Sequence, residues 1–175
     1  LNGKQLVTTE EMCAKVAAAR RARTHLRIVA RTDAVANEGL EGGIARAKAY
    51  VAAGADYAFA DGLTDADGVR RFAAECGAPF MANMTEFGKT PYLTAREFED
   101  LGCKLVIWPV SSMRVAAKAM ERVYGELAQK DTLFDHLDQM QTRAELYETI
   151  GYHEFETLDA SVATTIVPDD HRSKG

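Results

Sequence analysis

Short apolar segments alternate with longer segments of helical pattern four times along this chain. The apolar segments span residues 26–30, 55–60, 79–82 and 104–108. Helical patterns precede and follow them at residues 8–23, 40–53, 64–75, 94–101 and 111–128. Parallel strands need long crossovers that usually carry a helix, and strands covered by helices are apolar along most of their length. The alternation therefore predicts an α/β fold with a parallel sheet.

The residues that follow the apolar segments distinguish a barrel from a doubly wound sheet. A doubly wound nucleotide-binding fold would normally carry a glycine-rich phosphate loop, and neither G-x-G-x-x-G nor G-x-x-x-x-G-K-[ST] occurs. Polar residues instead follow each apolar segment, at the end of the strand where barrels build active sites. We therefore expect a (β/α)8 TIM-type barrel, of which this chain supplies about the last four β/α units plus C-terminal helices.

Four strands cannot close such a barrel, and an open half would leave two edge strands with unpaired backbone groups. Either a preceding half of the polypeptide supplies the other strands, or copies of this chain associate. The first residue is Leu1 and not Met, and a polar stretch runs directly into the first helical pattern. We expect the chain to begin partway through a longer protein.

Three regions are expected along the chain. Residues 1–128 form the C-terminal half of the barrel. Residues 129–157 form a helical extension that carries Tyr147, Tyr152 and Phe155, and we interpret it as a subunit interface. Residues 158–175 are expected to form a polar, irregular tail.

The charge pattern narrows the class of partner. Lys and Arg are interspersed with Asp and Glu, the net charge is −5, and the basic stripe of a nucleic-acid binder is missing. No apolar segment reaches the roughly 18 residues of a membrane span, and residues 1–10 lack the pattern of a secretory signal. We expect a small-molecule partner, no nucleic acid, no membrane and a cytoplasmic location.

The cysteines and histidines give no metal-binding pattern. Cys13, Cys76 and Cys103 are far apart and outside any C-x-x-C spacing, and the four histidines show no ligand spacing. We expect reduced, packed cysteines and no metal ligands in this chain. Residues 65–68 resemble the start of a calcium loop, but Cys76 occupies the twelfth position, so these acids are expected in the first turn of a helix.

Polar side chains that could carry chemistry gather after the apolar segments: Arg31, Thr32 and Asp33; Asp61; Asn83, Thr85 and Glu86; Ser111, Ser112 and Arg114. Arginine forks match carboxylate oxygens, so this set suits a substrate with several carboxylates. Asp33, Asp61 and Glu86 would lie beside a cation or orient the arginines. The alternatives stay open: an arginine could cap a helix or pair with an acid, and Asp33 could cap a loop. Ser111 and Ser112 lack a nucleophile elbow and are expected to cap a helix.

Three motifs carry a family resemblance. They are Ala-Arg-Thr-Asp-Ala at residues 30–34, Ala-Asn-Met-Thr-Glu-Phe-Gly at residues 82–88, and Met-Gln-Thr-Arg at residues 140–143 leading to Tyr147 and Gly151. The first motif is shared across the isocitrate lyase and phosphoenolpyruvate mutase superfamily, whereas the other two are more specific. From about Gly3 to Phe155 the chain resembles the 2-methylisocitrate lyase family.

This resemblance implies a magnesium-dependent carbon–carbon cleavage of 2-methylisocitrate to pyruvate and succinate, a step of propionate breakdown through the methylcitrate cycle. The positions that match the family's substrate contacts are Arg31, Asp61, Asn83, Met84, Thr85, Arg114 and Gly151. Asp33, Glu86 and Ser111 would support these contacts. The family usually has Glu where this chain has Asp61, and the shorter side chain would withdraw the carboxylate by about 1.5 Å.

The family's remaining catalytic groups are expected outside this chain. Its catalytic cysteine lies in a Lys-[KR]-Cys-Gly-His loop that would end just before Leu1, and its magnesium-binding aspartates lie earlier. None of the three cysteines here matches that motif. The resemblance therefore implies that this chain has no catalytic residue or Mg²⁺ ligand and is inactive alone, and that its partner is the N-terminal half of the same enzyme.

Two alternatives accompany this hypothesis. A sister enzyme of the superfamily, such as an isocitrate lyase or an oxaloacetate or phosphonopyruvate hydrolase, would be compatible with Asp61. A non-catalytic half-barrel that serves as an assembly module is the other. Members of the family form tetramers in which C-terminal helices pack on a neighbouring subunit, so a homotetramer is expected.

Overall fold

The computed structural model describes residues 5–162. The chain divides into two compact units, residues 1–116 and residues 117–175, with the division inside helix α5 (Ser111–Lys130). The sequence placed the end of its first region at residue 128, near the end of the same helix. Each unit has its own contacts and is described separately.

The first unit alternates strands and helices. Its elements are α1 (Thr9–Ala22), β1 (Val29–Thr32), α2 (Val35–Ala52), β2 (Tyr57–Ala60), α3 (Ala66–Glu75), β3 (Phe80–Asn83), α4 (Ala95–Asp100), β4 (Leu105–Ile107) and the start of α5. The strands pair in chain order, β1-β2-β3-β4, and every pair is parallel. The predicted α/β fold with a parallel sheet is confirmed.

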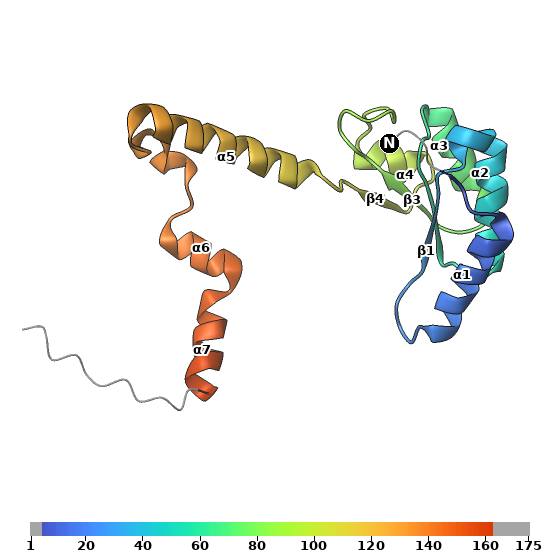
Figure 1. The fold of residues 1–175 in the computed structure, drawn as a ribbon, viewed down its shortest axis with the longest axis horizontal. Helices are drawn as coiled ribbons and strands as arrows, with labels where there is room; N and C mark the ends of the chain where they lie inside the picture. Colours follow the sequence, from blue (N-terminus) through green and yellow to red (C-terminus); the bar gives the residue numbers. More distant parts are fainter. Residues whose placement is uncertain (1–4, 163–175) are drawn as a thin grey trace, which may run out of the picture. The chain divides into compact units, whose positions relative to one another are not determined.

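The two faces of the sheet differ because side chains alternate along a strand. The first face is buried: Ala58, Ala60, Phe80 and Ala82 join a core with residues of α2, α3 and α4. In Figure 1, α2 and α3 lie side by side along the sheet. The opposite face is less covered, with Val29 40% exposed and Leu105 45% exposed.

The core of the first unit is aromatic where the helices meet the sheet. Phe72 of α3 and Phe98 of α4 are fully buried, and the Phe72 ring lies 4.9 Å from the Phe80 ring. Cys76 and Cys103 are buried in the same core, as predicted, and all three cysteines are free. Burial raises the pKa of the Cys103 thiol to about 11, so this thiol stays protonated and unreactive.

Side-chain caps start helices α1, α3 and α4. Thr8 accepts a hydrogen bond from the Glu11 N–H, and Thr94 forms a capping box with Glu97. Asp65 accepts from the Gly68 N–H at 2.8 Å, which confirms that residues 65–68 open a helix. Each cap satisfies an N–H that has no partner within its helix.

The predicted boundaries around β1 and α2 are wrong. Arg31 and Thr32 belong to β1 and do not follow it, because β1 pairs with β2 as far as Thr32 opposite Ala60. Helix α2 begins at Val35, five residues earlier than predicted, with a non-helical Gly39 at φ 75° and ψ 179°. Glycine adopts this conformation without the penalty that a side chain would bring.

The second unit is helical. It contains the rest of α5, a 3₁₀ helix η1 (Phe134–Gln139), α6 (Arg143–Ile150) and α7 (Tyr152–Val162). Thr142 and Glu145 form a capping box, and Gly151 ends α6 in the left-handed region at φ 64°. Tyr147 and Tyr152 stack across this junction with ring centroids 4.3 Å apart.

The irregular tail was predicted to start too early, because α7 continues through Leu158 to Val162. Phe155, Leu158 and Val162 recur at helical spacing, which extends the pattern of the helix past the predicted end. Residues 163–175 of the predicted tail lie outside the described residues. None of the described helices is long and apolar enough to cross a membrane.

The buried aromatic core yields a stability prediction. Phe72→Ala removes a fully buried ring and leaves a cavity, so we expect the free energy of unfolding to fall by about 3–5 kcal/mol. Tyr92→Ala is the control, because Tyr92 is 73% exposed in the same unit. Urea unfolding followed by circular dichroism measures both, and equal losses in the two variants would contradict this assignment of the core.

Candidate functional site

The carboxyl ends of the four strands bring the predicted polar residues to one edge of the sheet. Arg31 lies in β1, Asp61 directly follows β2, and Asn83 ends β3. The Asp61 N–H donates to the Thr32 carbonyl at 3.0 Å, which continues the pairing beyond the strands. Because the strands are parallel, these ends face the same side of the unit. We call this side the carboxyl edge.

Arg31 lies between two acids. Its Nε and Nη2 donate to the Asp33 carboxylate at 2.6 and 3.3 Å, and Nη2 donates to Asp61 Oδ2 at 2.7 Å. The guanidinium carbon also lies 5.3 Å from the centre of the Phe59 ring on the next strand. These hydrogen bonds, above all those to Asp33, raise the pKa of Arg31. Arg31 and Asp61 therefore meet, although Asp61 has a shorter side chain than the family's Glu.

Thr32 and Met84 are turned into the structure. Thr32 is buried, and its hydroxyl accepts from the Ala34 N–H at 3.2 Å. Met84 is buried in the core, and its sulfur accepts from the Leu93 N–H at 3.4 Å. The Met84 side chain is therefore not exposed for the predicted contact with a substrate, because it is buried and bonded to the Leu93 N–H.

Asn83 and Thr85 form a pair of half-buried polar groups. The Thr85 hydroxyl donates to Asn83 Oδ1 at 2.9 Å. This bond makes the amide oxygen an acceptor, so the Asn83 NH₂ group is the part available to donate to a ligand. The two residues together can present an amide donor at the carboxyl edge.

Glu86 joins the loop after β3 to the start of α5. The Ser111 hydroxyl donates to Glu86 Oε1 at 2.5 Å, and Arg114 Nη1 donates to the Glu86 carbonyl at 2.6 Å. The Ser111 hydrogen bond is the main reason why the pKa of Glu86 is lowered. The predicted capping role of Ser111 is therefore replaced by a bond to an acid.

Phe87 supports Arg114 from the same loop. The Arg114 guanidinium lies 5.5 Å from the centre of the Phe87 ring. Phe87 is 96% exposed and has a φ of 63°, a left-handed conformation that is uncommon for a bulky residue. Such strain is found most often where a loop has a functional role.

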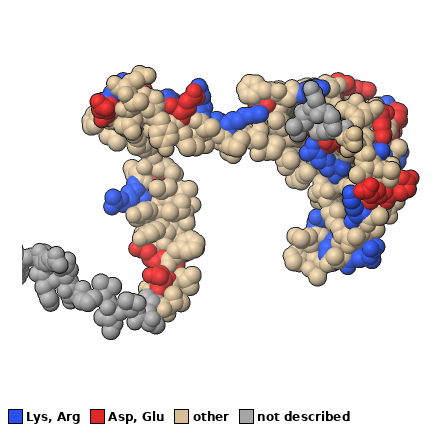
Figure 2. All heavy atoms as spheres, viewed as in Figure 1, with Lys and Arg blue, Asp and Glu red and all other residues tan. Residues whose placement is uncertain are grey.

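The charges of the carboxyl edge nearly cancel. Two arginines, Arg31 and Arg114, accompany three carboxylates, those of Asp33, Asp61 and Glu86. The set therefore has a net charge of −1. On the face drawn in Figure 2, basic and acidic side chains are likewise interspersed over the first unit.

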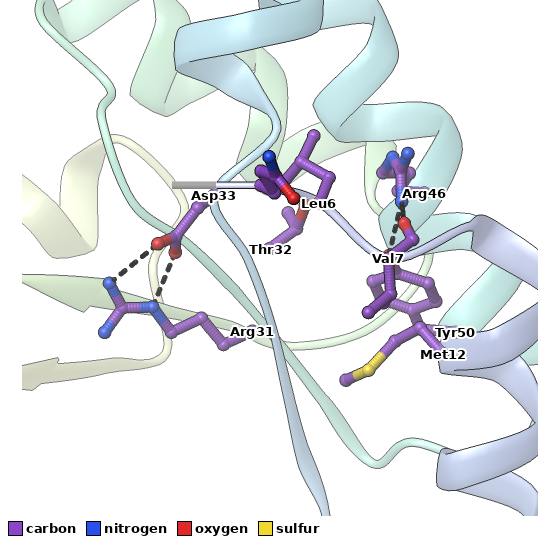
Figure 3. A pocket seen from close by; sticks show the side chains of 9 residues that line it. Leu6, Val7, Met12, Arg31, Thr32, Asp33, Arg46 and Tyr50 are labelled. Atoms are coloured by element: carbon purple, nitrogen blue, oxygen red, sulfur yellow. Dashed lines mark hydrogen bonds and ion pairs between the residues drawn. The ribbon is translucent and has the colours of Figure 1, made fainter. Parts of the chain in front are cut away.

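An open hollow of about 420 Å³ adjoins the site and contains residues that the sequence reasoning missed. Arg31, Thr32 and Asp33 line one side of it, and Leu6, Val7, Met12, Arg46 and Tyr50 are further lining residues (Figure 3). Arg46 donates to the Val7 carbonyl at 2.8 Å. No motif signalled this contact, because it joins residues 39 positions apart.

One predicted site residue lies outside the carboxyl edge, and the described residues form no metal-binding cluster. Gly151 lies in the second unit, where it caps α6, so its predicted substrate contact stays a prediction. Among residues 5–162, no three His, Cys, Asp or Glu side chains form a cluster that could hold a metal ion. The described residues therefore offer hydrogen-bonding and charged groups for a ligand, and no metal centre.

The Ser111–Glu86 bond gives a pKa prediction. Ser111→Ala removes a donor that favours the charged carboxylate, so the pKa of Glu86 should rise toward the ordinary glutamate value. This bond stabilises the fold above the unfolded-state pKa, and the stabilisation is lost as the pH falls through the lower folded-state pKa. Carbon-13 NMR titration of labelled glutamate measures the shift. Ser112→Ala, at the exposed neighbouring position, is the control; the same titration curve for both variants would contradict the assignment.

The sequence of this chain is similar to those of known proteins. The chain is 50% identical over 170 residues to the 2-methylisocitrate lyase of Bacillus subtilis, an alignment that covers 97% of this chain and 56% of that protein. Other curated 2-methylisocitrate lyases match similarly. The chain thus spans about half the length of the curated relatives it matches.

Solved structures share the fold. A 2,3-dimethylmalate lyase of the PEP mutase/isocitrate lyase superfamily superimposes with a TM-score of 0.81 at 30% identity, over 90% of this chain and 57% of that one. A phosphonopyruvate hydrolase in complex with oxalate and Mg²⁺ gives a TM-score of 0.78 at 24% identity, over 93% of this chain and 60% of that one. The family model for phosphoenolpyruvate phosphomutase matches residues 1–128. The chain therefore belongs to the phosphoenolpyruvate phosphomutase family.

Proposed function

We propose that the complete protein cleaves 2-methylisocitrate to pyruvate and succinate and that this chain holds the carboxylates of the substrate. The observation that carries the proposal is the pair of arginines at the carboxyl edge of a chain that is 50% identical to a 2-methylisocitrate lyase. Arginine binds carboxylates through paired N–H donors. The net reaction breaks one carbon–carbon bond and needs no oxidant or reductant.

Each residue at the edge has a definite part in this proposal. Arg31 and Arg114 bind carboxylate oxygens, and the Asn83 amide donates a further hydrogen bond. Arg31 Nη1 makes no hydrogen bond within residues 5–162, so donors remain on the guanidinium that Asp33 and Asp61 orient. Glu86 and Phe87 orient Arg114 in the same way. Fixed donors of this kind lower the entropy that substrate binding costs.

The charge of the edge indicates what the rest of the protein must supply. A substrate with three carboxylates would meet a set of residues whose own net charge is already −1, and this repulsion disfavours binding. Additional positive charge would offset this repulsion. We propose that it includes Mg²⁺, the ion found with oxalate in the phosphonopyruvate hydrolase of the same fold.

We propose that the metal ligands and the proton donor belong to a part of the complete protein that precedes this chain. Residues 5–162 contain no cluster that fits a metal ion. Cys76 and Cys103 are buried thiols with raised pKa values, which makes them unsuitable as proton donors to a substrate. The resemblance to the 2-methylisocitrate lyase family implies a catalytic cysteine just before Leu1.

We also propose that the sheet is one half of a (β/α)8 barrel. The strands pair in chain order with a helix in each connection, as in such barrels. Among the described residues, β1 and β4 have no second strand neighbour. The face of the sheet that carries Arg31 and Leu105 is less covered than the opposite face. Four further strands would pair both edges and enclose this face.

Turnover by the complete protein tests the function. We expect release of pyruvate from 2-methylisocitrate, measured with a coupled lactate dehydrogenase assay, and weaker turnover of isocitrate and oxaloacetate. No turnover of 2-methylisocitrate by intact, metal-supplied protein would refute the proposal. Preferential turnover of oxaloacetate would favour a sister activity, for which Asp61 in place of Glu is the supporting observation.

Arg31 provides the sharpest single-residue test. Arg31→Met should lower kcat/KM by about 100-fold or more, because two charge-assisted hydrogen bonds are lost. Arg31→Lys should recover little, since lysine keeps the charge but not the fork. The control is Arg70→Met, which alters an exposed arginine paired within α3. Unchanged kcat/KM in folded Arg31→Met would remove Arg31 from the substrate site.

We further propose that the second unit forms a subunit interface of a homotetramer. Phe155, Leu158 and Val162 lie on one face of α7 and are exposed, as are Leu146 and Ile150 on α6. Several exposed apolar side chains on neighbouring helices are typical of interaction sites.

An aspartate on that face tests the interface. Leu158→Asp should convert the tetramer into smaller species in native mass spectrometry, because a charge would be buried in an apolar contact. Ala160→Asp introduces the same charge on the opposite face of α7 and should leave the assembly intact. Persistence of the tetramer in Leu158→Asp would show that this face is not the interface.

A further inference from the structure

Arg46 of α2 makes hydrogen bonds to three other residues. Its Nε and Nη2 donate to the Glu38 carboxylate at 2.8 and 2.7 Å. Its Nη1 donates to the Val7 carbonyl at 2.8 Å and to the Tyr50 hydroxyl at 3.3 Å. The side chain is 12% exposed, so these bonds are largely shielded from water. The guanidinium is thus held in one orientation by three residues.

The kink in α2 makes this arrangement possible. Glu38 and Arg46 are eight positions apart, which in a regular helix corresponds to a rise of about 12 Å. Gly39 interrupts the helix with φ 75° and ψ 179°, so Glu38 does not continue the axis of the later turns. The Glu38 carboxylate can therefore reach the guanidinium in a bidentate contact, which leaves Nη1 free to bind elsewhere.

Val7 belongs to the segment that precedes α1. Within the described part of the chain, residues 5–7 make a single hydrogen bond, the one from Arg46 to the Val7 carbonyl. The same segment lines the hollow together with Arg31 and Asp33 (Figure 3). Arg46 therefore fixes the main chain of this segment beside the arginine that is proposed to bind the substrate.

We propose that Arg46 is a positioning residue for catalysis: by holding the Val7 carbonyl, it sets the path of the segment that leads to the proton donor. This inference rests on the proposed function, which places that donor just before Leu1. Arg46 itself touches neither substrate nor donor. A small displacement of a catalytic group can cost a large factor in rate, so anchoring its segment matters for turnover.

Kinetics of the complete protein test the catalytic part. Arg46→Met should lower kcat by about tenfold, the effect of one lost charge-assisted hydrogen bond, and should change KM by less than about twofold. The control is Lys48→Met, which removes an exposed cation from the same helix and should leave both constants unchanged. A rise in KM with an unchanged kcat would overturn the proposal, because it would place Arg46 in ground-state binding.

Native-state proteolysis tests the anchoring directly. Trypsin cleavage after Lys4, followed by mass spectrometry of the peptide that begins at Gln5, reports opening of this segment. Arg46→Met should be cleaved about tenfold faster than the unaltered protein, and Tyr50→Phe, which removes only the 3.3 Å contact, should resemble the unaltered protein. Equal cleavage rates in all three would overturn the proposal.

A second variant covers the case in which Arg46→Met does not fold. Glu38→Gln keeps a hydrogen-bonding side chain but removes the charge that orients Arg46, so it should show the same changes at smaller size. If the unaltered protein does not turn over 2-methylisocitrate, the proposed function fails while the proteolysis still judges the anchor. Faster cleavage with unchanged kcat would leave Arg46 a structural anchor only and refute its catalytic role.

Discussion

The parallel pairing of four consecutive strands is the constraint on which the rest of the structure depends. Each crossover must return the chain to the same end of the sheet, so each connection carries a helix, and every strand ends at the same edge. Polar residues that are far apart in the sequence, such as Arg31 and Asp61, meet there because of this pairing. The strand topology therefore decides which residues come together at the site, and individual contacts then orient their side chains.

Periodicity predicted the order and type of the elements, because short apolar strands and longer amphipathic helices have different repeats. It did not predict where β1 ends. The polar residues Arg31 and Thr32 resemble a loop, yet they remain in the strand, since strand length is decided by pairing with β2. The start of α2 was also missed: the predicted helix began at Leu40, whereas α2 has turns on both sides of Gly39.

The sequence predicted which residues form the candidate site but not which of them contact one another. Position after an apolar segment identified most of them, including Arg31, Asp61 and Arg114. The family resemblance added Met84 and Gly151. Their pairing was not predictable, because it depends on side-chain directions that no spacing encodes. Ser111 resembled a helix cap and instead donates to Glu86. Arg46 gave no signal at all, since its partners Glu38 and Val7 become neighbours only through a kink and a long-range contact.

The alternation of side chains along the strands has an evolutionary consequence. The helix-covered face is built largely from alanines, such as Ala58, Ala60 and Ala82, and its stability comes from packing against aromatic rings. Arg31 and its neighbour Phe59 point to the other face. Substitutions that change what the protein binds can therefore accumulate on one face while the other preserves the fold. Because of this separation, proteins with the same fold can evolve to bind different acids without first becoming more stable.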